Sequence, residues 1–229
     1  MILLVVLTAL FCCASTSQDT VSYWNRYWDE SHAIDLSDAT KALVPEHALV
    51  QADFEADLSG REEVTVYSVP VGQVESRPYI LFSRNGKARE LIDASKLIPV
   101  GPVEFRAGTF FHSGAFKALF FAFGTGVDGA GTYFFAMKVR NGKHSVFWHQ
   151  HTQQGRIELS SNPVGFSLWT ACCIEHDPLA NNCVWCTHRY EVTSFRWQGN
   201  GFLAVKMYKT REHLNPEPFV EKAITIKTR

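Results

Sequence analysis

From Ala48 onward the chain is a succession of short apolar runs separated by polar segments. The runs are rich in aromatic and β-branched residues and are bounded by Gly, Asn, Pro and Ser, which is typical of β-strands. Several runs are apolar at consecutive positions, as expected for strands that are buried on both faces. The expected strands are Val64–Tyr67, Tyr79–Phe82, Leu119–Phe123, Tyr133–Ala136, Ser145–Trp148, Gly165–Trp169, Tyr190–Trp197 and Phe202–Tyr208.

The dipeptide Asn-Gly separates three pairs of these runs. A type I′ hairpin turn needs positive φ at both central residues, which Asn and Gly adopt with the least strain. The turns recur at a spacing of roughly 55 residues, which indicates a repeated unit, although three common turns can also fall this way by chance. The Asn-Gly pairs begin at Asn85, Asn141 and Asn200. The expected repeat units are 46–98, 99–152 and 153–210, followed by a C-terminal extension at 211–229.

These patterns predict an all-β fold of repeated antiparallel hairpins. A truncated propeller-like arrangement, a sandwich and an open barrel all fit the pattern. Residues 18–45 differ from the rest and predict a short N-terminal helical arm packed on a sheet. Its second helix is expected from Ser37 to Val44 and is ended by Pro45. Its first helix is indicated by aromatic residues at helical spacing, namely Tyr23, Trp24, Tyr27 and Trp28.

The first residues, Met1–Ala14, carry no charged side chain and are nearly all apolar. As a helix they span about 21 Å, which is short of the roughly 30 Å hydrocarbon core of a bilayer. We interpret residues 1–17 as a signal peptide, so that residues 18–229 form one exported β-rich domain, secreted or periplasmic, with no transmembrane segment. A lipid-anchored form through Cys12 or Cys13 is the alternative.

Composition and charge add little to this picture. The chain has 46% hydrophobic and 20% charged residues, an ordinary globular mixture. Its net charge is −1, from 22 Lys and Arg against 23 Asp and Glu, and no long basic cluster of the kind that binds nucleic acid is present. The expected partner is a protein or a glycan.

The segment Asp57–Val66 contains the series Asp-Leu-Ser-Gly-Arg-Glu-Glu-Val-Thr-Val. It resembles a degenerate FG-GAP or VCBS-type repeat, the unit that builds β-propeller blades in exported proteins. The resemblance implies a loop that cradles calcium, with Asp57 as the first acid and Glu63 as the last. The central Asp-Gly pair of the family loop is missing here. Because calcium takes six to eight oxygen ligands, the resemblance implies a scaffold more than a metal site.

Four cysteines of the mature chain fall within one short segment: Cys172, Cys173, Cys183 and Cys186. An even number of clustered cysteines in an exported chain predicts disulfides. A bond between neighbouring cysteines is strained, so the preferred pairs are Cys172–Cys186 and Cys173–Cys183. Two alternatives remain open. Cys183-x-x-Cys186 followed by His188 has the spacing of zinc ligands, and the same two cysteines suit a thiol–disulfide protein.

Two further sets of side chains are candidate sites. His149 and His151 lie on one face of an expected strand and are candidate metal ligands, with His188 as a third. The alternative for this pair is a solvated strand end. Four tryptophans form a candidate platform for a sugar or a peptide, and sheet packing is the alternative; they are Trp148, Trp169, Trp185 and Trp197.

No set of acid, base and nucleophile converges in the sequence. The leading hypothesis is therefore an exported, non-catalytic β-scaffold with a binding or interaction role. The first alternative is a metal-binding protein or metal-dependent enzyme that uses His149 and His151. The second is a thiol–disulfide protein built on Cys183 and Cys186. No cofactor is predicted, and calcium and zinc are the candidate ions.

Overall fold

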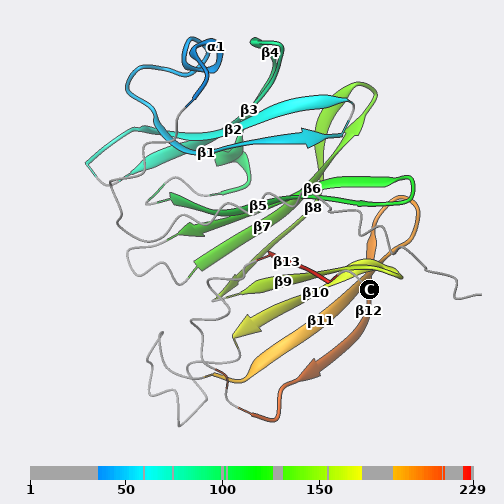
Figure 1. The fold of residues 1–229 in the computed structure, drawn as a ribbon. Coiled ribbons are helices and arrows are strands. Elements are labelled where there is room, and N and C mark those ends of the chain that lie inside the picture. Colours follow the sequence, from blue (N-terminus) through cyan, green and yellow to red (C-terminus); the bar gives the residue numbers. More distant parts are fainter. Residues whose placement is uncertain are drawn as a thin grey trace, which may run out of the picture.

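Almost the whole of the described chain is β-sheet, which confirms the predicted all-β fold (Figure 1). Within the described residues, no helix has both the length and the apolar character needed to cross a bilayer. The computed structural model describes residues 36–58, 60–73, 75–98, 101, 103–125, 131–153, 155–171, 188–212, 214 and 224–227.

Three antiparallel sheets of four strands follow one another along the chain, each in sequential strand order. Sheet A consists of β1 (Leu49–Asp57), β2 (Arg61–Pro70), β3 (Ser76–Arg84) and β4 (Lys87–Asp93). Sheet B consists of β5 (Val103–Ser113), β6 (Phe116–Thr125), β7 (Gly131–Arg140) and β8 (Lys143–Gln153). Sheet C consists of β9 (Arg156–Ser161), β10 (Val164–Ala171), β11 (Tyr190–Trp197) and β12 (Phe202–Lys209).

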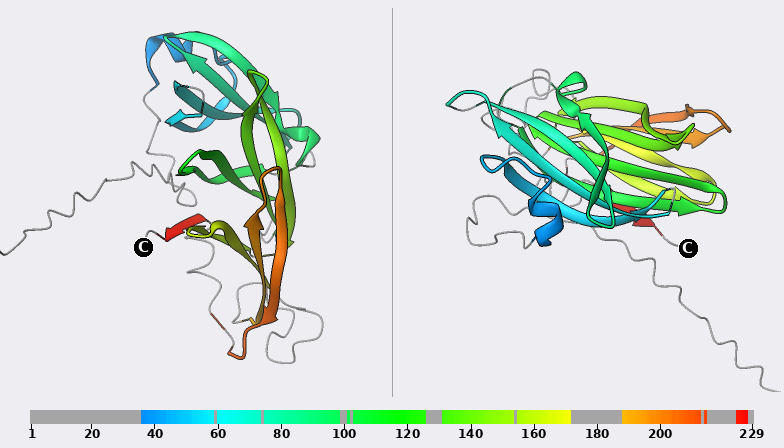
Figure 2. Two further views of the ribbon diagram at one scale, coloured as in Figure 1. Left: turned by 90° about the vertical axis from the view of Figure 1, so that its right-hand side faces the viewer. Right: turned by 90° about the horizontal axis from the view of Figure 1, so that it is seen from above.

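A fifth strand, β13 (Ile224–Lys227), joins sheet C by pairing in parallel with β9. The sequence pattern did not predict this strand, which comes from the expected C-terminal extension. The order of sheet C is therefore β12-β11-β10-β9-β13, with β12 and β13 at opposite edges. Figure 2 shows these two edges on opposite sides of the sheet.

Two of the three Asn-Gly turns have the predicted backbone. Asn85 and Gly86 have φ of 51° and 67°, and Asn141 and Gly142 have φ of 53° and 74°, as a type I′ turn requires. The third turn differs. Trp197 pairs with Phe202, so a four-residue loop connects β11 and β12, and its Gly199 has φ of 78°.

The helical prediction holds in part for the described residues. The helix α1 (Asp38–Lys41) is a single turn, shorter than the expected Ser37–Val44. The Ser37 hydroxyl accepts a hydrogen bond from the Thr40 amide at 3.1 Å and caps this turn. α1 lies on the side of sheet A away from sheet B (Figure 1). A short 3₁₀ helix, η1 (Ala94–Lys96), follows β4, and the aromatic positions of the predicted first helix lie outside the described residues.

The three sheets are stacked as layers, and sheet B lies in the middle. Alternate residues of β6 face opposite sides, which explains why the run Leu119–Phe123 is apolar at every position. Leu119, Phe121 and Phe123 belong to the core between sheets A and B. Phe120 and Ala122 belong to the core between sheets B and C. Full burial of a side chain such as Phe contributes roughly 1.5–3 kcal/mol, so β6 stabilises both interfaces.

Candidate binding surface

The outer edge of sheet C is the most exposed apolar element among the described residues. Every residue of β12 after Phe202 is exposed. Three of them carry large apolar side chains without a ring: Leu203 is 53% exposed, Val205 49% and Met207 63%. An exposed edge strand presents a row of unpaired backbone N–H and C=O groups to other chains. We call Leu203, Val205, Lys206, Met207 and Lys209 the edge surface.

A register shift divides the side chains of the edge surface between the two faces of sheet C. Ser194 pairs with Lys206 and Phe195 pairs with Ala204, so Val205 is the extra residue of a β-bulge. Leu203 lies opposite Arg196, whereas Met207 lies opposite Thr193. Arg196 and Thr193 are separated by an odd number of positions, so Leu203 and Met207 lie on opposite faces.

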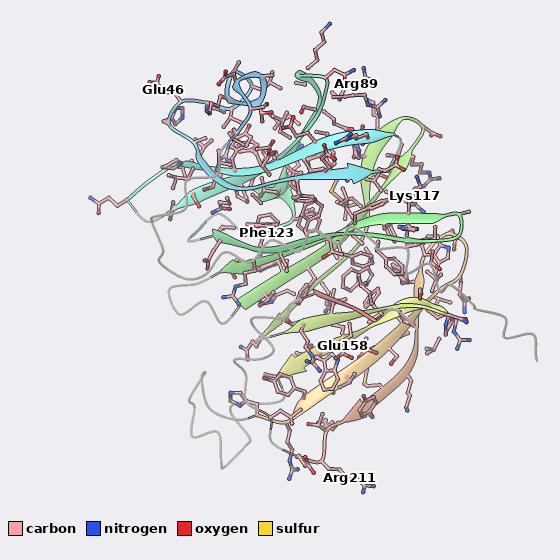
Figure 3. The ribbon with its side chains drawn as sticks, in the orientation of Figure 1. Glu46, Arg89, Lys117, Phe123, Glu158 and Arg211 are labelled. Carbon is pink, nitrogen blue, oxygen red and sulfur yellow. The ribbon has the colours of Figure 1, made fainter. Side chains whose placement is uncertain are left out.

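The β11–β12 hairpin and the residues beside it carry an excess of positive charge. Residues 188–212 contain five cations and two acids, although the whole chain has a net charge of −1. The cations are all exposed, and none of them is ion-paired to a described carboxylate. They are Arg189, Arg196, Lys206, Lys209 and Arg211. Figure 3 shows Arg211 at the end of the molecule farthest from α1.

An aromatic cluster fixes the beginning of β12 to sheet B. The ring of Phe202 lies 5.2 Å from that of Trp197 and 5.6 Å from that of Phe147, between ring centroids. The Lys138 ammonium lies 4.6 Å from the Trp197 ring centroid and 4.9 Å from that of Phe147. Partial burial, and then the charge of Arg140, lower the pKa of Lys138. The edge surface is thus presented by a strand whose first residue is packed against two sheets.

The structure separates the predicted tryptophans, so the described ones do not form a single platform. Trp148 packs on Phe166 at 4.6 Å in the core between sheets B and C, and Trp197 belongs to the aromatic cluster. Trp169 lies three positions from Phe166, hence on the opposite face of β10, and Arg156 lies 4.3 Å above its ring. Trp185 lies outside the described residues, as do Cys172, Cys173, Cys183 and Cys186.

The structure divides the predicted metal-binding histidines between β8 and a segment that precedes β11. His149 and His151 are exposed on β8. His151 stacks on Tyr133 at 4.3 Å, and partial burial lowers its pKa. His188 is buried beside β11, where its backbone pairs with Leu214. Among the described residues, no group of three His, Cys, Asp or Glu side chains is arranged to hold a metal ion.

The two acids of the predicted calcium loop bind other groups of the protein. Asp57 accepts hydrogen bonds from the Gly60 amide at 3.0 Å and from the Lys117 ammonium at 2.8 Å. The hydrogen bond from Lys117 is the main cause of a lowered pKa at Asp57. Glu63 accepts a hydrogen bond from the Ser83 hydroxyl at 3.0 Å. A lysine of sheet B therefore supplies the positive charge that faces Asp57.

The sequence reasoning missed a buried polar contact between sheets A and B. The imidazole of His144 on β8 lies with Nδ1 2.9 Å from Glu90 Oε2 and Nε2 3.1 Å from Glu62 Oε2. Glu90 also accepts a hydrogen bond from the His144 amide at 2.8 Å. The ring of Phe82 stacks on the imidazole at 3.6 Å. We call Glu62, His144 and Glu90 the carboxylate–histidine bridge.

One feature of the sequence indicated that sheet A carries a buried carboxylate. Glu62 shares the face of β2 that also carries Val64 and Val66, which are fully buried. An acid on a core-facing position needs a partner, because an unpaired buried carboxylate is strongly unfavourable. The identity of that partner was not readable, since His144 lies 82 positions away in the chain.

A half-buried acid lies on the opposite face of sheet A. Asp53 accepts a hydrogen bond from the Thr65 hydroxyl at 2.8 Å. Burial raises the pKa of Asp53 to about 6, the hydrogen bond from Thr65 opposes this rise, and the neighbouring Glu63 adds to it. Asp53 is therefore partly protonated at mildly acidic pH.

No family model, curated protein sequence or solved structure matches this chain. The resemblance of Asp57–Val66 to FG-GAP or VCBS-type repeats accordingly stays a prediction. What the protein does is therefore inferred from its own surface and contacts.

Proposed function

We propose that this protein is an exported, non-catalytic β-scaffold that binds a protein or glycan partner through the edge surface of sheet C. The observation that carries the proposal is β12, a strand with large exposed apolar side chains and two exposed lysines at the edge of a five-stranded sheet. Exposed apolar surface that is rimmed by polar residues marks interaction sites, and here it follows the outer edge of one strand.

The contacts between the sheets support the role of a scaffold. The carboxylate–histidine bridge joins sheet A to sheet B. The side-chain amide of Gln51 on β1 does the same: its Nε2 donates to the Val103 carbonyl at 3.3 Å, and its Oε1 accepts from the Phe105 amide at 3.2 Å. These contacts fix sheet A to sheet B, and the contact between Phe202 and Phe147 fixes the beginning of β12 to sheet B. A surface that is held in place in this way loses little conformational entropy on binding, which favours affinity.

The proposal is tested by screening the purified exported protein against a random peptide library and a glycan panel. Each ligand is then measured against a variant with Leu203→Ser, Val205→Ser and Met207→Ser. Because these side chains are exposed, the variant should fold, and we expect affinity to fall by about tenfold or more. The matched control is Leu91→Ser, which removes a 53% exposed aliphatic side chain from β4, the edge strand of sheet A.

Other outcomes separate the alternatives. Ligands that bind the triple variant as well as the original chain would contradict a site on β12. Binding that requires added zinc or calcium, and that is lost in His149→Ala, would favour the metal-binding alternative. Reactive thiols at Cys183 and Cys186 in the native protein would favour the thiol–disulfide alternative.

A further inference from the structure

We infer that β12 binds an extended acidic segment of another protein, which adds to sheet C as a further strand. This inference rests on the proposed function and specifies the chemistry of its partner. Its first support is topological. β12 pairs with β11 on one side and is the last strand of sheet C on the other, so its outward N–H and C=O groups face no other strand of that sheet. Peptides bind such edges through main-chain hydrogen bonds, and side chains determine specificity.

The length of β12 suits this mode of binding. The strand runs from Phe202 to Lys209, and eight residues of extended chain span about 26 Å. A partner strand of similar length forms a ladder along this edge. The β-bulge at Val205 interrupts the pairing with β11 at one position, so two stretches of regular strand flank it.

The positive charge on and beside β12 favours an acidic partner. Lys206 and Lys209 project from β12 itself, Arg196 lies on β11 opposite Leu203, and Arg211 follows the C-terminal end of β12. All four side chains are exposed. Opposite charges that face each other across neighbouring strands attract, whereas like charges repel. An acidic strand is therefore favoured and a basic strand is excluded.

The distribution of side chains over the two faces specifies the pattern of the partner. Leu203 and Lys206 lie on the face of Arg196 and Ser194. Met207 and Lys209 lie on the other face, opposite Thr193 and Glu191. Tyr208 shares the first face and Ala204 the second, so each face combines apolar side chains with one lysine. A matching strand has apolar and acidic residues alternating on both of its faces, as in the repeat Val-Glu-Glu-Val.

A second copy of this chain is a poorer occupant. Pairing β12 with itself brings two strands together that each carry Lys206 and Lys209 and no acid. Lysines and bulges on edge strands are among the features that prevent such self-association. The same features leave the edge open to an acidic partner.

The test uses fluorescein-labelled synthetic peptides and the whole purified protein. The acidic probe is two copies of Val-Glu-Glu-Val in tandem. The controls are the same peptide with Lys or with Gln in place of Glu, and an acidic peptide that is N-methylated at every residue and so cannot donate a main-chain hydrogen bond from either edge. Fluorescence anisotropy should show about tenfold tighter binding of the acidic probe than of every control, and this binding should weaken with added salt.

Charge reversal makes the test specific to β12. The variant with Lys206→Glu and Lys209→Glu should lose the acidic probe and gain the lysine probe. The matched variant, Lys87→Glu with Arg89→Glu, reverses two exposed charges on β4, the edge strand of sheet A, and should leave both affinities unchanged. Both substituted pairs are exposed, so far-ultraviolet circular dichroism of each variant should match the original.

The outcomes distinguish failure of this inference from failure of the proposed function. Equal binding of the acidic, lysine and glutamine probes, or undiminished binding of the N-methylated probe, overturns strand addition by an acidic segment. The binding scaffold survives that result if library ligands still depend on Leu203, Val205 and Met207. Concentration-dependent dimers that disappear in the charge-reversed variant would instead identify a second copy as the occupant. If neither the probes nor any library ligand depends on β12, both proposals fail.

Discussion

His144 is the residue whose two ring nitrogens both meet carboxylate oxygens. Nδ1 lies against Glu90 and Nε2 against Glu62, so one imidazole joins carboxylates from two different strands of sheet A. Glu62 is buried, and Arg84 also approaches it at 3.4 Å. His144 and Arg84 thus both lie against the buried Glu62 carboxylate at the interface of sheets A and B.

Substitution of His144 by Leu should strongly destabilise the protein, because it leaves two carboxylates without their shared partner. Removal of one partner from a buried charged pair lowers the free energy of unfolding by roughly 3–5 kcal/mol. Urea unfolding followed by circular dichroism measures this loss. The control is Glu55→Gln, which removes an exposed ion pair with Arg61 and should change stability far less, because water screens such a pair. Equal effects of the two substitutions would show that the carboxylate–histidine bridge is not a structural contact.

Asp53 gives the protein a distinctive pH dependence. Its pKa in the folded state is about 6, above the ordinary 3.8, so the folded chain binds the proton more tightly than the unfolded chain. This acid therefore favours folding at low pH, and its contribution is lost as the pH rises through about 6. Asp53→Asn keeps an oxygen that accepts from Thr65 and should make the protein more stable than the original at pH 7. The difference should disappear near pH 4.

Asp57→Asn is the natural comparison, because the pKa of Asp57 is shifted in the opposite direction by Lys117. Its contribution is present above the ordinary pKa and is lost as the pH falls. The substitution should slightly lower stability at pH 7, by less than about 1 kcal/mol for such an exposed pair. Thermal unfolding of both variants between pH 4 and pH 7 measures whether each substitution raises or lowers stability. If both variants change with pH in the same direction, the opposite pKa shifts of Asp53 and Asp57 are contradicted.

At the scale of elements, the two type I′ hairpins differ in what surrounds them. A Cβ added at Gly86 would lie 2.7 Å from the Ala39 Cβ of α1, whereas nothing lies within 4 Å of one added at Gly142. The β3–β4 turn is thus also the contact that seats α1 on sheet A. At Gly142, the β7–β8 turn makes no comparable contact.

The pair Gly86→Ala and Gly142→Ala separates backbone strain from packing. Both glycines have positive φ, and an L-residue there costs about 1–2 kcal/mol. Gly142→Ala should lower the free energy of unfolding by this amount alone. Gly86→Ala should lower it further, because α1 must also move. Chemical denaturation measures both, and limited proteolysis near residue 40 should increase only in Gly86→Ala. An equal loss in the two variants would mean that the contact with Ala39 is unimportant.

At the scale of the whole molecule, sheet B is shared by two cores. Figure 3 shows Phe123 in the layer between sheets A and B, and its neighbours in β6 alternate between that layer and the one next to sheet C. Disruption of either interface therefore disturbs a strand that supports the other.

This sharing predicts that the three sheets unfold together. Phe121→Ala, in the core between sheets A and B, should destabilise the protein by roughly 3–5 kcal/mol. Trp148 belongs to the other core, and Trp197 contacts it through Phe147 and Phe202. The unfolding midpoint from tryptophan fluorescence should therefore equal the midpoint from far-ultraviolet circular dichroism. Phe120→Ala, on the opposite face of β6, is the matched variant. A tryptophan transition that Phe121→Ala leaves unchanged would show that the sheets unfold independently.

The sequence by itself determined the local features of this protein. Apolar runs at consecutive positions indicated strands with two buried faces, and the Asn-Gly pairs at residues 85 and 141 indicated tight hairpins. These features depend on the backbone preferences of a few adjacent residues and on burial with a period of two. Antiparallel meanders follow from them because each strand pairs with the next.

Only the tertiary structure decided which distant side chains meet. It brought Glu62 and Glu90 to His144 and placed Lys117 of sheet B beside Asp57. It placed Trp148, from sheet B, and Trp169, from sheet C, on opposite sides of sheet C. It also paired β13 with β9 and left β12 exposed at the opposite edge. Such contacts depend on how the sheets stack and on which strand forms the edge of each sheet. Hydrophobic periodicity specifies that a face is buried, and the packing of the whole chain selects what covers it.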